Sequence, residues 1–211
     1  ERGQYIVDRI LAGEDCAIVS DAGMPCISDP GEDLVRICAE QNVTVTVIPG
    51  PSAVISALAL SGLKTSRFTF EGFLSTNKTN RVNHLKSLKA EERTMIFYEA
   101  PHKLSSTLKD MLAVLGDRQI SIAREITKVY EQVIRFTLSQ AVEHYQTTPP
   151  RGEFVLVISG CEPTEEEQVT FEQVVSMAQA MVAEGQKATE VSKELAKAYG
   201  FKKTEIYKEL L

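Results

Sequence analysis

Residues 16–31 read Cys16-Ala-Ile-Val-Ser-Asp-Ala-Gly-Met-Pro-Cys-Ile-Ser-Asp-Pro-Gly31. The first four residues are apolar and predict a short strand, while the glycines, prolines, serines and aspartates after them predict a tight loop. An amphipathic helix follows the loop. We expect Asp29 at its N-cap, Pro30 at its first position and Glu32 at its third, the arrangement of a capping box.

The same order of elements then repeats. Val43–Val47 alternates valine with threonine and predicts a second strand, because β-branched residues favour extended backbone. Pro49-Gly-Pro-Ser52 predicts a turn, and Ala53–Leu60 predicts a helix that is apolar on nearly all sides and therefore buried. Strand, tight turn and helix, twice over, predict parallel strands in an α/β sheet. Ligands of such sheets bind at the carboxyl ends of the strands, where both turns are expected.

The middle of the chain has a different pattern. Short apolar runs predict five strands, at Phe68–Glu71, Thr94–Tyr98, Ile120–Ala123, Glu131–Thr137 and Phe154–Ser159. Two helices are expected between them, at Arg81–Leu88 and His102–Leu115. Consecutive strands over residues 120–137 indicate an antiparallel portion, so we expect an α+β domain with its own sheet.

The last part of the chain is predicted to be helical. Helices are expected at Phe171–Glu184, Ala188–Tyr199 and Lys202–Leu211, with Gly200 between the last two as in a helix-turn-helix, although a plain helical bundle is equally consistent. The expected domains are therefore an N-terminal α/β domain over 1–68, a central α+β domain over 69–160, a linker over 161–167 and a C-terminal helical domain over 168–211.

Composition describes an average globular protein. The chain has 211 residues, 43% of them hydrophobic, which excludes a disordered chain, and it lacks the roughly 18 consecutive apolar residues of a membrane-spanning helix. Its net charge of −6 divides into −4 over residues 1–68, +2 over 69–160 and −4 over 161–211. Only the middle segment therefore favours an anionic partner such as nucleic acid.

The cysteines and histidines predict no disulfide and no metal site. Cys16 and Cys38 lie in apolar runs and are expected to be small buried hydrophobes. Nothing in the sequence is typical of a secreted protein, so reduced thiols and a cytoplasmic location are favoured over disulfides. The three histidines lack the spacing of metal ligands.

Three clusters of residues suit chemistry. The loop 20–31 combines serine and aspartate with glycine, which lets a ligand approach the backbone; a helix cap with a tight turn is an equally good interpretation. Glu99 and His102 lie where a strand ends and a helix begins, a place that favours acid–base chemistry or anions, although a surface turn explains them as well. The charges at 124–128 suit a phosphate or carboxylate, or are simply solvated.

Six motifs occur in the order found in one family: 19–31, Pro49–Ala53, Phe70–Leu74, Phe97–Lys103, Ala123–Lys128 and Arg151–Val157. Together they closely resemble the RsmI family of bacterial small-subunit ribosomal RNA methyltransferases, within the tetrapyrrole methylase superfamily. The resemblance implies a two-domain tetrapyrrole-methylase-like α/β fold with a C-terminal helical segment. Its motifs are specific because they are several and ordered.

The resemblance also implies an activity. Members of the family transfer a methyl group from S-adenosyl-L-methionine to the 2′-hydroxyl of a cytidine ribose in the decoding region of 16S rRNA, in the 30S subunit, and are homodimers. Two other functions stay open. The wider superfamily methylates small molecules or proteins, and the chain could instead be a non-catalytic RNA-binding protein.

The motifs assign roles to particular residues of this sequence. The residues implied in cofactor binding are Ser20, Asp21, Ala22, Gly23, Pro25, Ser28, Asp29, Pro30, Gly50, Pro51, Ser52, Ala53, Tyr98, Gly152 and Glu153. The candidates for catalysis are Glu99, His102 and Lys128. The candidates for RNA contact are Lys103, Arg124, Lys128, Lys202 and Lys203. Our hypothesis is that Arg124 and Lys128 hold RNA phosphate while Glu99 or His102 handles the hydroxyl.

Several positions depart from the family pattern. Met24 stands where a small residue is usual, Lys103 replaces arginine, and Gln132 replaces the second of two glutamates. Family members also begin with a strand and a Pro-x-Gly-Asn-Leu loop of the cofactor cleft, to which nothing here corresponds. The chain is therefore expected to lack its natural start.

Overall fold

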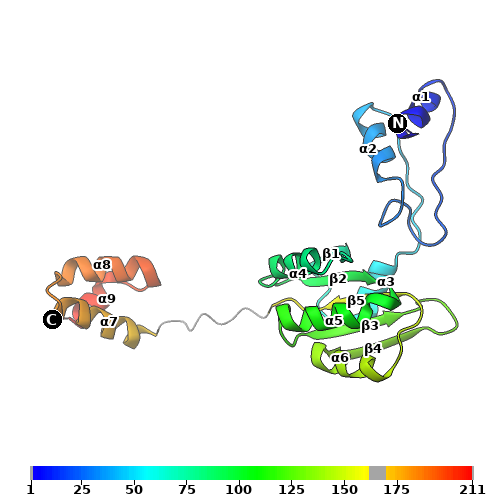
Figure 1. Cartoon of the computed structure of the whole chain (residues 1–211). Helices are drawn as coiled ribbons and strands as arrows, with labels where there is room; N and C mark the ends of the chain where they lie inside the picture. The colour runs from blue at the N-terminus through cyan, green and yellow to red at the C-terminus, as the bar shows by residue number, and fades with distance from the viewer. Residues whose placement is uncertain (1, 162–169, 211) are drawn as a thin grey trace. The chain divides into compact units, whose positions relative to one another are not determined.

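The structure is a computed structural model that describes residues 2–161 and 170–210. The chain divides into two compact units, Glu1–Cys161 and Glu162–Leu211 (Figure 1). The predicted linker, except Cys161, falls outside the described residues. The finer boundary expected at residue 68 stays a prediction.

The first unit is built on a five-stranded sheet. Its strands are β1 (Phe68–Phe73), β2 (Thr94–Glu99), β3 (Gln119–Arg124), β4 (Gln132–Thr137) and β5 (Phe154–Ile158), in the order β1-β2-β5-β3-β4. β1 and β2 are parallel, and the other three pairings are antiparallel. All five predicted strands and the antiparallel β3–β4 pair are thus confirmed.

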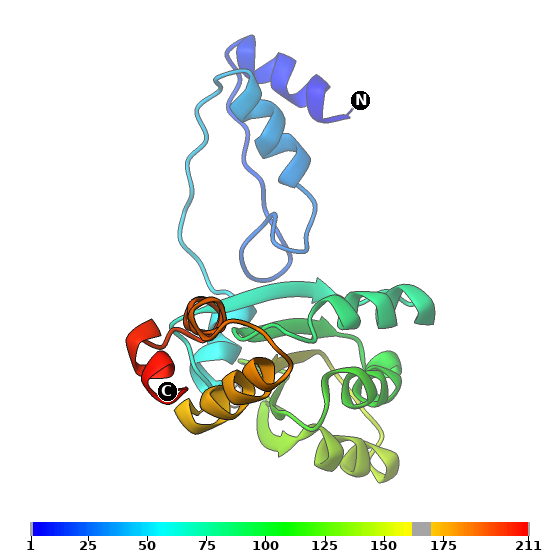
Figure 2. The same cartoon turned by 90° about the vertical axis from the view of Figure 1, so that its left-hand side faces the viewer.

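Helices cover both faces of this sheet (Figure 2). On one face α3 (Ala53–Ser61) packs Val54, Ala57 and Leu58 against Ile96 and Val157 of the strands. The predicted helix is confirmed, but its burial is not complete, because Ile55 and Leu60 are 52% and 40% exposed. On the other face lie α5 (Pro101–Leu115) and α6 (Leu138–Thr147), whose leucines share a second core with the sheet. α4 (Lys78–Ser87) packs beside α5.

Helix α6 is absent from our sequence-based expectations. It begins at a capping box, in which the Thr137 side chain accepts from the Gln140 backbone N–H and the Gln140 side chain accepts from the Thr137 backbone N–H. The pattern Thr-x-x-Gln is the signal that would have located its start. This start signal was not recognised because a strand rich in β-branched residues ends at the same position where the helix begins.

Two predicted strands of the N-terminal part are wrong. Neither 16–19 nor 43–47 pairs with another strand among the described residues, although α1 (Arg2–Leu11) and α2 (Glu32–Glu40) form and pack together. Val19 is 87% exposed and Val47 69% exposed. β-branched residues favour extended backbone, but a strand exists only where a neighbour completes the hydrogen-bonded ladder.

The predicted capping box at 29–32 is also wrong. Gly31 occupies the N-cap of α2 without a side-chain bond, and Asp29 instead accepts a hydrogen bond from Ser20 Oγ at 2.9 Å. Asp29 therefore stabilises the loop and does not cap the helix. Of the two cysteines expected in the interior, Cys38 is buried but Cys16 is exposed, because the strand expected around it does not pair.

The second unit is a small helical bundle. It contains α7 (Phe171–Ala183), α8 (Ala188–Tyr199) and α9 (Lys203–Lys208), which share an apolar core of Val174, Ala178, Val191, Leu195 and Ile206. Gly200 ends α8 in the left-handed conformation, and the chain turns there into α9. In neither unit do the described residues form a helix long and apolar enough to cross a membrane.

Candidate functional site

The topology brings several predicted residues to one end of the sheet. β1, β2 and β3 all finish there, at Phe73, Glu99 and Arg124. β5 runs in the opposite direction and starts there, since Phe154 pairs with both Glu99 and Arg124. The motifs at 97–103, 123–128 and 151–157 are far apart in sequence but share this end.

The loop 20–31 is held in a defined shape. Ser20 Oγ donates to Asp29 Oδ2 at 2.9 Å and also lies 3.1 Å from the carbonyl oxygen of Ala22. Cys26 and Ser28 have φ angles of 68° and 58°, a conformation that non-glycine residues rarely adopt. Asp21 is exposed and has no partner within the described residues. The loop thus offers a free carboxylate on a constrained backbone.

This loop lies against the turn that precedes α3. A Cβ atom at Gly23 would come within 3.4 Å of the Pro51 carbonyl oxygen, and one at Gly50 within 3.3 Å of the Met24 sulfur. A Cβ at Gly72, where β1 has an irregular register against β2, would lie 4.0 Å from Ser28 Oγ. The three glycines thus lie where two turns and a strand end come within contact distance, and Gly23 and Gly72 have positive φ angles that favour glycine.

Tyr98 connects the sheet with these turns. Its ring contacts Phe70 and Phe73, at centroid distances of 4.9 and 5.4 Å, and so completes an aromatic wall at the ends of β1 and β2. Burial raises the pKa of its hydroxyl, a hydrogen bond with the Val54 backbone opposes the rise, and the charge of Asp29 adds to it. The hydroxyl therefore connects the end of β2 with the backbone of Val54 at the start of α3.

Glu99 points into the protein. Its side chain is 1% exposed, Oε2 accepts from Thr107 Oγ1 at 2.6 Å, and Oε1 accepts from the Ala100 backbone N–H at 2.8 Å. Lys103 Nζ lies 3.3 Å from Oε1 and donates to the Leu74 carbonyl. These contacts hold both side chains at the start of α5, so neither group is free of a partner.

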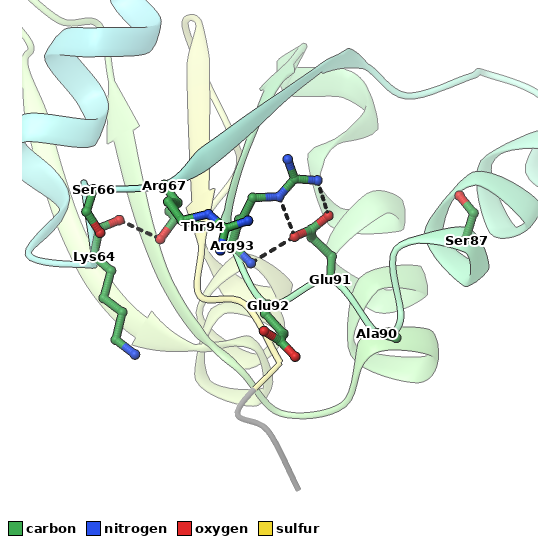
Figure 3. Close-up of a pocket in the computed structure, with 9 residues that line it drawn as sticks. All are labelled: Lys64, Ser66, Arg67, Ser87, Ala90, Glu91, Glu92, Arg93 and Thr94. Atoms are coloured by element: carbon green, nitrogen blue, oxygen red, sulfur yellow. Dashed lines mark hydrogen bonds and ion pairs between the residues drawn. The ribbon is translucent and has the colours of Figure 1, made fainter.

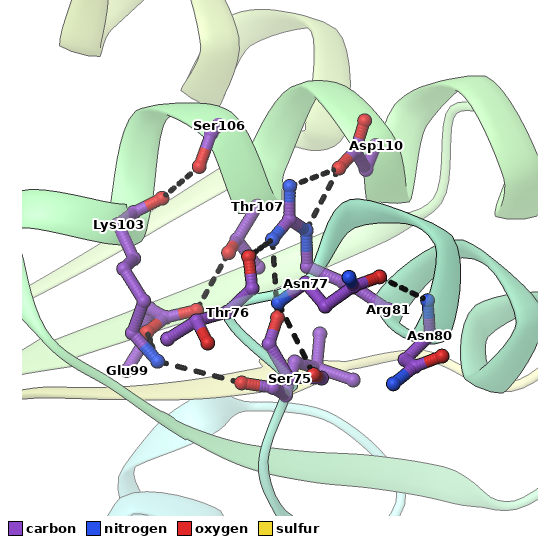
Figure 4. A network of polar contacts seen from close by, with 11 residues as sticks. Ser75, Thr76, Asn77, Asn80, Arg81, Glu99, Lys103, Ser106, Thr107 and Asp110 are labelled. Carbon is purple, nitrogen blue, oxygen red and sulfur yellow. Dashed lines mark hydrogen bonds and ion pairs between the residues drawn. The ribbon is translucent and has the colours of Figure 1, made fainter.

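A second ion pair fixes the loop that follows β1 (Figure 4). Arg81 is buried, pairs with Asp110 at 2.7 Å, and donates from Nη1 to the carbonyl oxygens of Ser75 and Thr76. Lys103 holds Leu74 in the same way. Two cations therefore donate hydrogen bonds to the carbonyl oxygens of residues 74–76, and each cation pairs with a carboxylate.

The charges at 124–128 and 151–153 form one cluster. Lys128 Nζ bridges Glu153, at 2.8 Å, and Glu125, at 3.1 Å. These bonds raise the pKa of Lys128, with Glu153 the larger cause, while the Glu153 backbone N–H and then Lys128 lower the pKa of Glu125. Arg124 Nε donates to the Arg151 carbonyl at 2.6 Å. Lys128 is thus already paired, and half of its side chain faces solvent.

The remaining predicted residues lie in the first turn of α5 and in the helical unit. His102 is exposed in the first turn of α5, near the same sheet end as Glu99. Lys202 and Lys203 belong to the helical bundle, where Lys202 pairs with Glu205 at 3.3 Å. No group of three or more potential metal ligands occurs among the residues that the structure describes.

Sequence reasoning missed the aromatic wall and the Arg81–Asp110 pair. Phe70 and Phe73 belong to a quoted motif, but they lie three positions apart, which regular strand alternation would place on opposite faces. The irregular register between Phe70 and Gly72 and the packing of both rings on Tyr98 give them a place in the site. Nothing in the sequence distinguishes Arg81 from a solvated helix charge, because its partner lies 29 residues away.

The chain is similar to known methyltransferases. A family model described as Tetrapyrrole (Corrin/Porphyrin) Methylases matches residues 1–142. The Ribosomal RNA small subunit methyltransferase I of Synechocystis is 44% identical, over 98% of this chain and 74% of that protein. The protein of the same name from Thermotoga maritima is 48% identical, over 77% of this chain and 72% of that protein.

Solved structures share the fold at low identity. The methyltransferase CobJ has a TM-score of 0.56 with 17% identity, over 76% of this chain and 70% of that one. The cobalt precorrin-4 methyltransferase CbiF has a TM-score of 0.52 with 16% identity, over 75% of this chain and 70% of that one. These likenesses show the architecture.

Proposed function

This chain belongs to the tetrapyrrole methylase family and, within it, to the ribosomal RNA small subunit methyltransferase I family, and we propose that it methylates ribosomal RNA of the small subunit with S-adenosyl-L-methionine as donor. The resemblance found in the sequence is thereby confirmed. The observation that carries the proposal is the meeting of loop 20–31, the turn before α3 and Tyr98 at the end of the sheet. Ligands bind at this end in α/β folds.

The residues at this meeting point fit the methyl donor. Asp21 offers a carboxylate for its amino group or ribose hydroxyls, and the closely approaching glycines Gly23 and Gly50 leave backbone groups open. When bound, S-adenosyl-L-methionine supplies a methyl group on a positively charged sulfur. The chain's part is to hold donor and acceptor in line, which lowers the entropic cost of the reaction.

The finer proposal is that the acceptor is the 2′-hydroxyl of a cytidine in the decoding region of 16S rRNA, in the 30S subunit. A ribose hydroxyl is a weak nucleophile, so a base that takes its proton assists the reaction. His102 is exposed in the first turn of α5, whereas the Glu99 carboxylate is enclosed by Thr107 and Lys103. We therefore assign the proton to His102 and a positioning role to Glu99.

RNA contact is proposed for the charged cluster and the helical unit. Arg124 uses Nε to hold the Arg151 carbonyl, which leaves its other nitrogens for phosphate. Lys128, although paired, is 48% exposed at the side chain and lies in the same cluster. Lys202 and Lys203 extend the proposed contact to the second unit.

We also propose that the protein is a cytoplasmic homodimer. Support comes from Val45, Val47, Ile48 and Ile55, large apolar side chains that are 51%, 69%, 89% and 52% exposed. A second copy that covers them would remove this apolar surface from water. Sedimentation should give twice the chain mass, and Val47→Glu with Ile48→Glu should give monomers. A monomeric wild-type chain would contradict the proposal.

The direct test supplies the chain with small ribosomal subunits that lack the modification and with methyl-labelled S-adenosyl-L-methionine. Label should appear in 16S rRNA, and digestion to nucleosides should yield 2′-O-methylcytidine. Label on a base would contradict the finer proposal, and label only in protein would contradict the RNA substrate. Asp21→Asn should weaken donor binding measured by calorimetry, while Asp33→Asn, an equal charge change on α2, should not.

A further inference from the structure

A pocket of about 630 Å³ lies at the other end of the sheet, where β1 and β2 begin (Figure 3). Its walls are the segment 64–67 before β1 and the segment 91–94 that leads into β2. β1 and β2 are parallel and six residues long, so a distance of about 20 Å along the strands separates this pocket from the proposed methyl-transfer site. It is a separate feature of the molecule.

Thr94 joins the two walls through two hydrogen bonds to backbone carbonyls. Thr94 Oγ1 donates to the Lys64 carbonyl at 2.6 Å, and the Thr94 N–H donates to the Arg67 carbonyl at 3.3 Å. The side chains of Lys64 and Arg67 play no part in these bonds. Both are exposed, and neither has a hydrogen-bond or ion-pair partner among the described residues.

The charges of the pocket leave an excess of cations. It is lined by Lys64, Arg67 and Arg93 against Glu91 and Glu92. Arg93 donates two side-chain hydrogen bonds to Glu91, of 2.7 and 2.6 Å, so the charges of these two residues cancel. Two free cations then face one free carboxylate, and the hydroxyl of Ser66 adds a neutral donor.

We propose that this pocket binds a phosphate group. Cations and hydroxyl donors around a hollow recognise phosphate oxygens, and the volume of about 630 Å³ is within the range of about 300–1,000 Å³ typical of small-molecule sites. The phosphate belongs either to the RNA backbone or to a free polyphosphate. The RNA source rests on the proposed function, because an RNA that reaches the methyl-transfer site would have to extend along the sheet.

The test compares charge changes inside and outside the pocket. Lys64→Gln with Arg67→Gln removes both free cations, and Lys86→Gln with Lys89→Gln removes two exposed lysines nearby that do not line the pocket. Binding of a fluorescent single-stranded RNA and of inorganic tripolyphosphate is measured over a range of salt concentrations. We expect the pocket variant to weaken binding roughly three- to tenfold and to lower the salt slope for RNA by about 0.7 per lost phosphate contact.

A variant that should strengthen binding distinguishes loss of the site from damage to the fold. Glu92→Gln takes away the remaining carboxylate and should tighten binding, which damage to the fold would not do. Loss of RNA binding alone identifies the RNA backbone as the source, and loss of both identifies a site for free phosphate as well. Unchanged binding in the pocket variant, or an equal loss in the Lys86/Lys89 control, overturns the proposal.

This test is independent of methyl transfer. If the wild-type chain binds tripolyphosphate through Lys64 and Arg67 but methylates no ribosomal RNA, the proposed function fails and the pocket stands. If it methylates the RNA while the pocket variant binds both probes normally, the pocket proposal alone fails.

Discussion

Thr107 Oγ1 lies 2.6 Å from Glu99 Oε2, and this bond joins the end of β2 to the second turn of α5. Among the ion pairs of the described residues, Glu99 is the least exposed acid, with 1% of its side chain exposed. A buried carboxylate persists when its oxygens are bonded, and here Ala100, Lys103 and Thr107 all contribute. The geometry of the candidate site therefore depends on Glu99, whose side chain holds the end of β2 and α5 together.

Loss of this bond should destabilise the fold. Thr107→Val keeps the volume and the helix but leaves Glu99 Oε2 without its donor, so we expect a loss of about 1–3 kcal/mol in the free energy of unfolding. Ser106→Val, one residue earlier and exposed, should cost much less. Chemical denaturation monitored by circular dichroism measures both, and an equal cost for the two would refute the assigned role.

The Arg81–Asp110 pair should matter more than a surface pair. The two side chains are 7% and 14% exposed, and Arg81 also holds two loop carbonyls. Asp110→Ala leaves a buried cation without its partner, and we expect a loss of roughly 3 kcal/mol. Glu40→Ala breaks the exposed pair with Arg36 on α2 and should cost less than about 1 kcal/mol. Urea titration compares them.

A side chain at Gly152 should be costly. Its φ is +85°, and a Cβ would come within 2.6 Å of the Glu125 side chain. We expect Gly152→Ala to cost more than the roughly 1 kcal/mol of backbone strain alone and to disturb the bridge from Lys128 to Glu125 and Glu153. Gly185 has a similar φ of +97° with no atom within 4 Å, so Gly185→Ala isolates the backbone cost. Equal losses in melting temperature would refute the steric explanation.

Low pH should lower the free energy of unfolding, partly because Glu91 becomes protonated. Hydrogen bonds from Arg93, first its side chain and then its backbone, lower the pKa of Glu91 to about 2. Because the folded pKa lies below the unfolded one, this stabilisation is present above pH 4.5 and is lost as the pH falls towards 2. Arg93→Gln should therefore lower stability at pH 6 and have little effect near pH 2. A constant effect over this range of pH would contradict the assignment.

The roles proposed for His102 and Glu99 can be tested by kinetics. His102→Ala removes the proposed base, and we expect the methylation rate to fall roughly a hundredfold with little change in stability. Lys109→Ala, also exposed on α5, is the control. Glu99→Gln should instead lower stability together with activity. Normal turnover of His102→Ala would refute the proposed base.

The sequence alone determined the elements that depend on local patterns. The five central strands, the helix Ala53–Leu60 and the three C-terminal helices follow from periodicity, β-branching and glycine stops, which act over a few neighbouring residues. The family followed from six motifs in order. The two false strands show the limit of this reasoning, because Val43–Val47 has the right residues but lacks a neighbouring strand.

Tertiary structure decided which of the candidate residues are free to act. Asp29, predicted to cap a helix, accepts a hydrogen bond from Ser20 instead. Lys103 pairs with the buried Glu99, and Lys128 bridges two glutamates. Glu153 lies 25 residues from Lys128, and the Leu74 carbonyl that Lys103 also bonds lies 29 residues away, so no local pattern contains these two contacts. A charged residue's role depends on the groups that surround it in space, and only the fold brings those groups together.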